Sequence, residues 1–169
     1  GTDPTACVDM ACPVGNESYY YGAFNDSIVY VTSSTAGQRF NVNSFNASFI
    51  GADPNLSSYP VYAGMLRVQG WLADGRTTYM NFLLDGPGTT GFNFGHYVAP
   101  TAFASLDFVQ VAFFGLACSQ SGTCTPFTTN QGQFGIDDIE LTAVPEPASA
   151  LLFGLGLAGL VAGARRRKA

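Results

Sequence analysis

Residues 65–85, MLRVQGWLADGRTTYMNFLLD, combine two alternating segments with an Asp-Gly turn signal between them. Apolar side chains recur at every second position on each side of the turn, which is typical of half-buried β-strands. A two-residue turn pairs Leu72 with Thr77 and throws the apolar sets of the two strands onto opposite faces. A three-residue loop at 73–75, with Gly75 in the left-handed region, puts them on one face, so we predict that loop.

The other face of this hairpin carries aromatic and polar side chains together. The set is Arg67, Gln69, Trp71, Tyr79 and Asn81. Aromatic rings pack against the C–H faces of sugars while polar groups hydrogen-bond to the hydroxyls, so this face is a candidate glycan-binding site. The competing interpretation is cross-strand packing on the outer face of a sheet, with no ligand.

Short apolar or alternating segments continue on both sides of the hairpin over residues 19–142, and none of them holds a helical period for three turns. That pattern predicts an all-β protein. The strands we expect are Ser27–Thr32, Arg39–Phe49, Gly64–Leu72, Thr77–Leu84, Phe92–Tyr97, Leu106–Leu116 and Gln133–Thr142. They predict two packed antiparallel sheets, a β-sandwich of jelly-roll type, and a barrel is the alternative.

The last predicted strand contains an acidic pair. Phe134 and Ile136 share one parity and Ile139 has the other, so we expect the strand either to bulge or to change its exposure between Asp137 and Asp138, which turns one carboxylate inward. An inward carboxylate needs hydrogen-bond donors or a cation. Because Ca²⁺ takes oxygen ligands, Asp137 and Asp138 are a candidate structural calcium site, and a structural Asp bonded to the backbone is the alternative. We expect no other cofactor.

The composition excludes disorder, since the 169 residues are 47% hydrophobic and only 11% charged, which suits one packed domain. Of the seven cations, only Arg39, Arg67 and Arg76 precede the C-terminal tail, whereas all twelve acidic residues lie within the first 146 positions. This body therefore has a formal charge of −9 and the tail one of +4. Such a body offers phosphate backbones no counter-charge, so we expect no nucleic-acid partner.

Residues 148–164, ASALLFGLGLAGLVAGA, form an apolar segment that precedes a basic tail at 165–169 containing Arg165, Arg166 and Arg167. An apolar helix of about 17–25 residues spans a bilayer, and basic clusters stay on its cytoplasmic side. We therefore expect one C-terminal transmembrane helix with the tail inside and the body across the membrane. A buried core helix is the alternative.

Pro145, Glu146 and Pro147 stand just before the apolar segment, and the two prolines predict an extended linker over 144–147. The tripeptide, the apolar helix and the basic end together resemble the PEP-CTERM sorting signal of Gram-negative bacteria. The resemblance implies export, transient anchoring in the inner membrane, recognition by an exosortase, cleavage near the tripeptide, and release or attachment at the cell surface. It also implies an association with exopolysaccharide and biofilm.

Gln133, Phe134 and Asp137 resemble the Gln-Phe-x-x-Asp motif of a subgroup of these proteins with a β-sandwich ectodomain. The family's precursors begin with a signal peptide. Because the sequence starts at Gly1 without such a segment, we interpret the chain as a mature or truncated form.

Four cysteines in an exported chain predict two disulfides, for which three connectivities exist. We favour the two local bridges, Cys7 to Cys12 and Cys118 to Cys124. A zinc site is disfavoured because the spacings do not fit paired zinc ligands and His96 is the only histidine. The expected organisation is an N-terminal segment with a disulfide at 1–18, a β-sandwich ectodomain at 19–143 and the sorting signal at 144–169.

The sequence contains no nucleophile elbow, no His-Glu-x-x-His and no phosphate-binding loop. Adjacent carboxylates on the last strand point to opposite faces, which does not aim two acids at one glycosidic bond. We therefore expect a non-enzymatic protein of the cell surface or extracellular matrix, structural or adhesive among exopolysaccharides. A carbohydrate-binding module is the alternative, and polysaccharide is the expected extracellular partner.

Overall fold

The computed structural model describes residues 9–145 of the chain. Its strands are β1 Pro13–Val14, β2 Tyr21–Ala23, β3 Ile28–Thr32, β4 Phe40–Phe49, β5 Tyr62–Leu72, β6 Thr77–Asp85, β7 Phe92–Asn93, β8 Gly95–Val98, β9 Phe108–Cys118, β10 Cys124–Thr125 and β11 Phe134–Ala143. Two short helical segments accompany them, the 3-10 helix η2 at Leu56–Ser58 and the helix α1 at Thr101–Ala104. The prediction of an all-β protein is confirmed.

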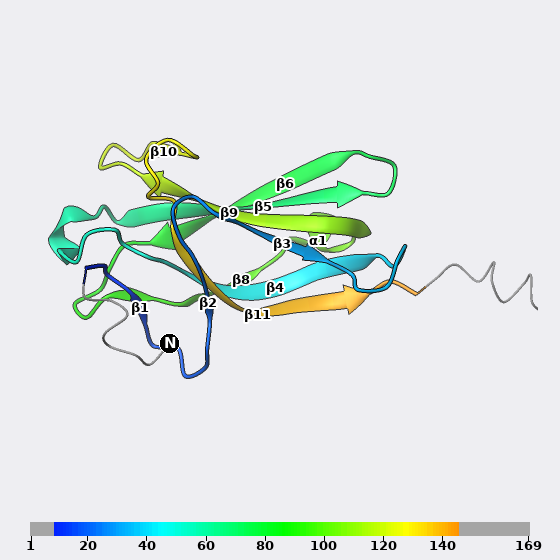
Figure 1. Ribbon diagram of the computed structural model, residues 1–169, viewed down its shortest axis with the longest axis horizontal. Coiled ribbons are helices and arrows are strands. Elements are labelled where there is room, and N and C mark those ends of the chain that lie inside the picture. The colour runs from blue at the N-terminus through cyan, green and yellow to red at the C-terminus, as the bar shows by residue number, and fades with distance from the viewer. Residues whose placement is uncertain (1–8, 146–169) are drawn as a thin grey trace, which may run out of the picture.

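The strands form two layers, which Figure 1 shows with β4 and β11 below β5, β6 and β9. One layer has the order β2-β11-β4-β8, and the other has the order β3-β9-β5-β6 with β10 beside β9. The two layers join through a single residue pair, Phe40 with Phe108. All strand pairs are antiparallel except the short parallel pair of β1 and β7. Through the pair of Phe40 with Phe108 the strands form one nine-stranded antiparallel sheet, and the β-sandwich of jelly-roll type stays a prediction.

Aromatic side chains fill the space between the layers. Phe45 of β4 packs edge-on against Phe82 of β6, with ring centroids 5.0 Å apart, and against Phe113 of β9 at 5.4 Å. Leu66 and Val68 of β5 are fully buried in the same cluster. Strands from both layers therefore bury their apolar side chains in one shared core.

The hairpin of β5 and β6 has the predicted three-residue loop. Trp71 pairs with Thr77, the Leu72 amide donates to the Arg76 carbonyl at 2.9 Å, and the Gly75 amide donates to the Leu72 carbonyl at 3.0 Å. Gly75 has a φ of +83°, in the left-handed region. The apolar sets of both strands consequently face the core together, as the parity of the sequence predicts.

The expected strand at Phe92–Tyr97 is wrong as a single element. It divides at Phe94 into β7, which pairs with β1, and β8, which pairs with β4. The chain therefore changes its pairing partner within this short segment, and nothing in the alternation of residues 92–97 marks that change.

Within residues 9–145, no helix is long and apolar enough to cross a membrane. The predicted transmembrane helix at 148–164 lies outside the described residues, as do Glu146, Pro147 and the basic tail.

Candidate functional site

The outer side of the layer β3-β9-β5-β6 carries the predicted glycan-binding residues, and we name it the outer face. Strand pairing aligns its side chains in rows that run across the four strands. The first row is Ile28, Phe114, Arg67 and Asn81; the second is Tyr30, Ala112, Gln69 and Tyr79; the third is Thr32, Gln110, Trp71 and Thr77; and Leu116, Met65 and Leu83 form a fourth. All five predicted residues thus lie on one continuous surface.

Arg67 is held by two neighbours across the hairpin. Its Nε donates to Oδ1 of Asn81 at 2.8 Å, and its guanidinium carbon lies 4.3 Å from the centre of the Tyr79 ring. Tyr79 remains 59% exposed even so. One face of the Tyr79 ring is therefore occupied by a cation, and the ring orients Arg67 in addition to offering a stacking surface.

Trp71 is half-buried and packs in a second apolar cluster, on the outer face itself. The buried members of that cluster are Ala112, Phe114 and Leu116 of β9. Phe127, from the segment after β10, stacks on Phe114 with ring centroids 5.3 Å apart. The competing interpretation of cross-strand packing therefore describes part of this surface correctly, because its β9 side is buried under its own aromatic neighbours.

Two exposed aromatic residues of this surface were not predicted from the sequence. Tyr30 of β3 is 56% exposed and lies in the row of Gln69 and Tyr79, while Phe127 caps Phe114. Tyr30 and Ile28 are two residues apart in their strand, so the sequence could have placed both side chains on the same face of it. The sequence alone does not show that this short strand pairs with β9.

The acidic pair of the last strand produces the predicted bulge but not the predicted burial. Asp137 pairs with Asn46 and Glu140 with Ser44, which leaves one extra residue on β11, and Asp138 adopts a φ of +47°. The expectation that one carboxylate turns inward is wrong, because Asp138 is exposed and Asp137 only half-buried. The left-handed conformation at Asp138 absorbs the change of parity, so Ile139 packs on the core without carrying an acid inward.

Both carboxylates instead accept hydrogen bonds from side chains outside the core. Asp137 accepts from the Ser18 hydroxyl and, at 3.0 Å, from the Asn16 amide, which ties the N-terminal segment to the last strand. The Ser18 hydrogen bond, followed by that from Asn16, holds the pKa of Asp137 below its usual value. Asp138 accepts from the Asn46 amide at 2.8 Å.

The side-chain oxygen of Asn46 lies 2.9 Å from Nδ1 of His96, which extends this polar network across three strands. The candidate calcium site stays a prediction. No group of three or more His, Cys, Asp or Glu side chains within residues 9–145 is placed to hold a metal ion.

The residues that resemble the Gln-Phe-x-x-Asp motif have three separate structural settings. Gln133 is 5% exposed and its amide donates to the Asn130 carbonyl at 3.3 Å, while its Oε1 has no partner among the described residues. Phe134 is fully buried in the main core. Together with the Asp137 contacts, these settings fasten the last strand to its neighbours. Membership of the subgroup stays a prediction.

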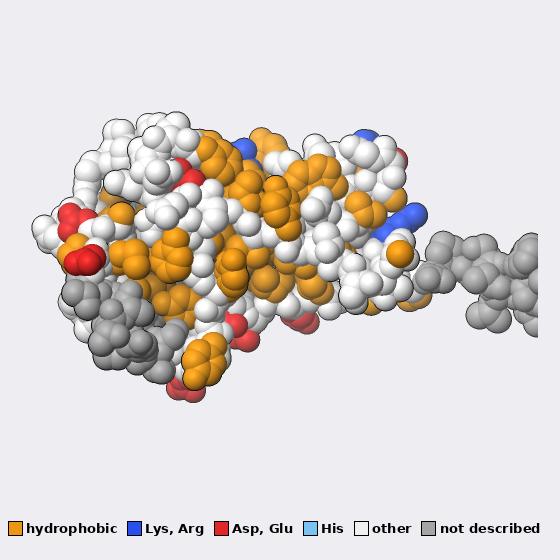
Figure 2. Space-filling view, in the orientation of Figure 1, with side chains coloured by type: hydrophobic (Ala, Val, Ile, Leu, Met, Phe, Trp, Pro, Cys, Tyr) orange, Lys and Arg blue, Asp and Glu red, His pale blue; other side chains and the backbone are white. Residues whose placement is uncertain are grey.

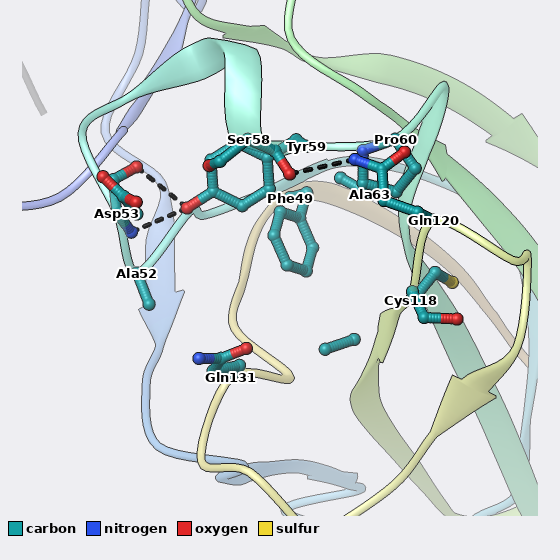
Figure 3. A pocket seen from close by; sticks show the side chains of 12 residues that line it. Phe49, Ala52, Asp53, Ser58, Tyr59, Pro60, Ala63, Cys118, Gln120 and Gln131 are labelled. Carbon is teal, nitrogen blue, oxygen red and sulfur yellow. Dashed lines mark hydrogen bonds between the residues drawn. The ribbon is translucent and has the colours of Figure 1, made fainter.

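A cavity of about 360 Å³ opens where β4 and β9 end and β5 begins, and Figure 3 shows its lining. Phe49 and Ala63 contribute apolar surface, and Gln120 and Gln131 contribute amides. The hydroxyl of Tyr59 donates to the Asp53 carbonyl at 2.8 Å and accepts from the Asp53 amide at 2.6 Å. Burial raises the pKa of Tyr59. This cavity shares no residue with the outer face.

The disulfide between Cys118 and Cys124 is confirmed, and it joins two residues that pair directly across β9 and β10. The hairpin closes with the same loop geometry as the β5–β6 hairpin. The Ser119 amide donates a hydrogen bond to the Thr123 carbonyl, and Gly122 has a φ of +81°. The predicted bridge from Cys12 to Cys7 involves a residue outside the described range and stays a prediction.

The C-terminal part of the chain matches a known sorting signal. Residues 143–168 match the family model described as the PEP-CTERM protein-sorting motif. The matched segment begins at the last residue of β11 and includes Pro145, Glu146, Pro147, Arg165, Arg166 and Arg167. No curated protein matches the chain. The motif implies export with transient membrane anchoring, followed by processing by an exosortase.

Proposed function

We propose that the chain is an exosortase-processed protein of the cell surface or extracellular matrix, with a structural or adhesive role among exopolysaccharides. The observation that carries the proposal is the sorting motif at 143–168, placed directly behind the last strand. Proteins sorted in this way act outside the inner membrane, where the disulfide Cys118–Cys124 is stable.

The place of the motif suits release of an intact domain. Ala143 pairs with Phe40, and the Val144 amide donates to the Arg39 carbonyl at 2.9 Å. The next residue, Pro145, is exposed and has no amide hydrogen to give. Cleavage near the tripeptide therefore leaves every strand pair of the domain in place.

The experiment compares the wild-type chain with the triple variant Pro145→Ala, Glu146→Ala, Pro147→Ala in a host that contains an exosortase. We expect the wild type in the surface or extracellular fraction and the variant in the membrane fraction at precursor size. Pro54→Ala, in an exposed loop, is the matched control and should be sorted like the wild type. Equal release of the triple variant would contradict the proposal.

A second candidate function is glycan binding by the outer face, and the row of Tyr30, Gln69 and Tyr79 favours it. Two exposed aromatic rings stand at the ends of this row, three strand spacings or about 14 Å apart, with an amide between them. That length exceeds one sugar ring, so the row fits a chain of sugars better than a monosaccharide.

Calorimetry of the full chain with the producing organism's own polysaccharide tests this function. We expect measurable binding that weakens about five- to thirtyfold in Trp71→Ala and in Tyr30→Ala, because each variant removes one stacking surface worth about 1–2 kcal/mol. Tyr19→Ala, which removes an exposed tyrosine that belongs to none of the four rows, should bind like the wild type. Unchanged affinity in the first two variants would remove the glycan-binding function.

A further inference from the structure

The outer face is free of acidic side chains, although the body of the protein is strongly acidic. None of the residues in its four rows is Asp or Glu, while the first 146 residues carry a formal charge of −9. Asp74 and Asp85 lie outside the outermost rows. Asp74 is in the hairpin loop, and Asp85 is the last residue of β6. An anionic ligand therefore meets no carboxylate in the rows themselves.

Arg67 is the one cation in these rows, and no acid neutralises it. The salt bridge found within residues 9–145 joins Arg76 to Asp74, at the tip of the hairpin. Cationic side chains are also sparse in Figure 2, where hydrophobic side chains gather along the middle of the visible face. The charge of Arg67 thus remains available to a ligand.

The guanidinium of Arg67 is oriented before any ligand arrives. Asn81 holds its Nε at 2.8 Å and the Tyr79 ring supports its plane from 4.3 Å. Among the described residues, the two terminal nitrogens have no hydrogen-bond partner. A fixed guanidinium fork with free terminal donors matches the two oxygens of a carboxylate, and fixing it beforehand lowers the entropy cost of binding.

We propose that the outer face binds an acidic polysaccharide whose sugars carry carboxylates, with Arg67 as the carboxylate-binding residue. Trp71 and Tyr30 stack on sugar rings, Gln69 lies in the row of Tyr30 and next to Trp71 along β5, and Tyr79 and Asn81 are positioning residues for Arg67. This proposal rests on the glycan-binding function above and names the chemical class of its ligand.

The test uses the full chain in nonionic detergent with EDTA present, so that calcium bridges between acidic groups do not contribute. The probes are polygalacturonate and its highly methyl-esterified form, which has the same backbone without the charge. We expect polygalacturonate to bind at least about tenfold more tightly than the ester. Arg67→Gln should remove this preference, and Arg67→Lys should restore only part of it because the ammonium lacks the planar fork.

Arg76→Gln is the matched control, because it removes the same charge from the same hairpin. It should bind polygalacturonate like the wild type, and unfolding curves of each variant should show that the fold is kept. Equal losses in Arg67→Gln and Arg76→Gln, or equal binding of the acid and the ester, would overturn the proposal.

The outcomes also separate this proposal from the function on which it rests. Binding of both probes that is lost in Trp71→Ala but unchanged in Arg67→Gln refutes carboxylate recognition and keeps glycan binding. If neither probe binds and the native polysaccharide does not bind either, carboxylate recognition and glycan binding are both refuted.

Discussion

Gly75 has a left-handed backbone conformation that the three-residue loop of the β5–β6 hairpin requires. Its φ is +83°, and a Cβ added there meets no atom within 4 Å, so any cost of substitution comes from the backbone alone. Gly75→Ala is therefore expected to lower the free energy of unfolding by about 1 kcal/mol, measured by urea denaturation. Gly75→Asn should lose less, because Asn tolerates this region better. A fully stable Ala variant would contradict the assigned loop.

Asp137 is expected to make stability depend on pH. Hydrogen bonds from Ser18 and Asn16 favour its ionised form and lower its pKa in the folded state. A lowered carboxyl pKa contributes stability above the unfolded value, about 3.9, and that contribution is lost as pH falls through the folded value. The free-energy difference between wild type and Asp137→Asn, from urea unfolding, should therefore be larger at pH 7 than at pH 3.

Ser18→Ala removes the main donor to this carboxylate and should reduce the same pH dependence. A difference between wild type and Asp137→Asn that is equal at pH 7 and pH 3 would mean that the Asp137 hydrogen bonds do not stabilise the fold.

At the level of single residues, the parity of the hairpin was sufficient to place Arg67, Trp71 and Tyr79 on one surface. The parity did not predict which contacts each of these side chains makes on that surface. That Arg67 covers one face of the Tyr79 ring depends on side-chain torsions, which strand alternation does not determine. Whether the Asp137 carboxylate is buried likewise depends on the backbone conformation of its neighbour Asp138, which the sequence does not determine.

The longer strands were predictable because apolar alternation over many residues has one interpretation. The boundaries of β4, β5, β6 and β11 agree with the sequence to within two residues. The short strands β1, β2 and β10 and the helix α1 were missed, since two to four residues carry no measurable period. Pairing partners, including β3 beside β9, come from tertiary packing and have no local signal.

The β9–β10 hairpin is closed by the Cys118–Cys124 disulfide, which is expected to stabilise the domain. The crosslink closes a short loop and restricts the unfolded chain, which is worth about 2 kcal/mol for a loop of this length. The double variant Cys118→Ser, Cys124→Ser should lose about that amount in urea unfolding. Some of the loss also comes from packing, since Cys124 contacts the apolar cluster of the outer face. A double variant as stable as the wild type would show that the crosslink does not constrain unfolding.

The whole molecule divides its charge between a body of −9 and a tail of +4. The sorting motif at 143–168 contains the basic tail and begins where the last strand ends. Removal of the tail leaves an acidic domain whose strands are complete and whose outer face lacks acids. A net charge far from zero favours solubility, and an outer face without acids is what the proposed binding of an acidic polysaccharide requires.

The mass of the protein recovered outside the inner membrane shows whether an exosortase has processed the chain. Intact-mass spectrometry of the surface or extracellular fraction should give a chain that ends between Ala143 and Pro147, without the apolar segment and basic tail. An extracellular chain that still ends in the sequence RRRKA at 165–169 would contradict processing by an exosortase.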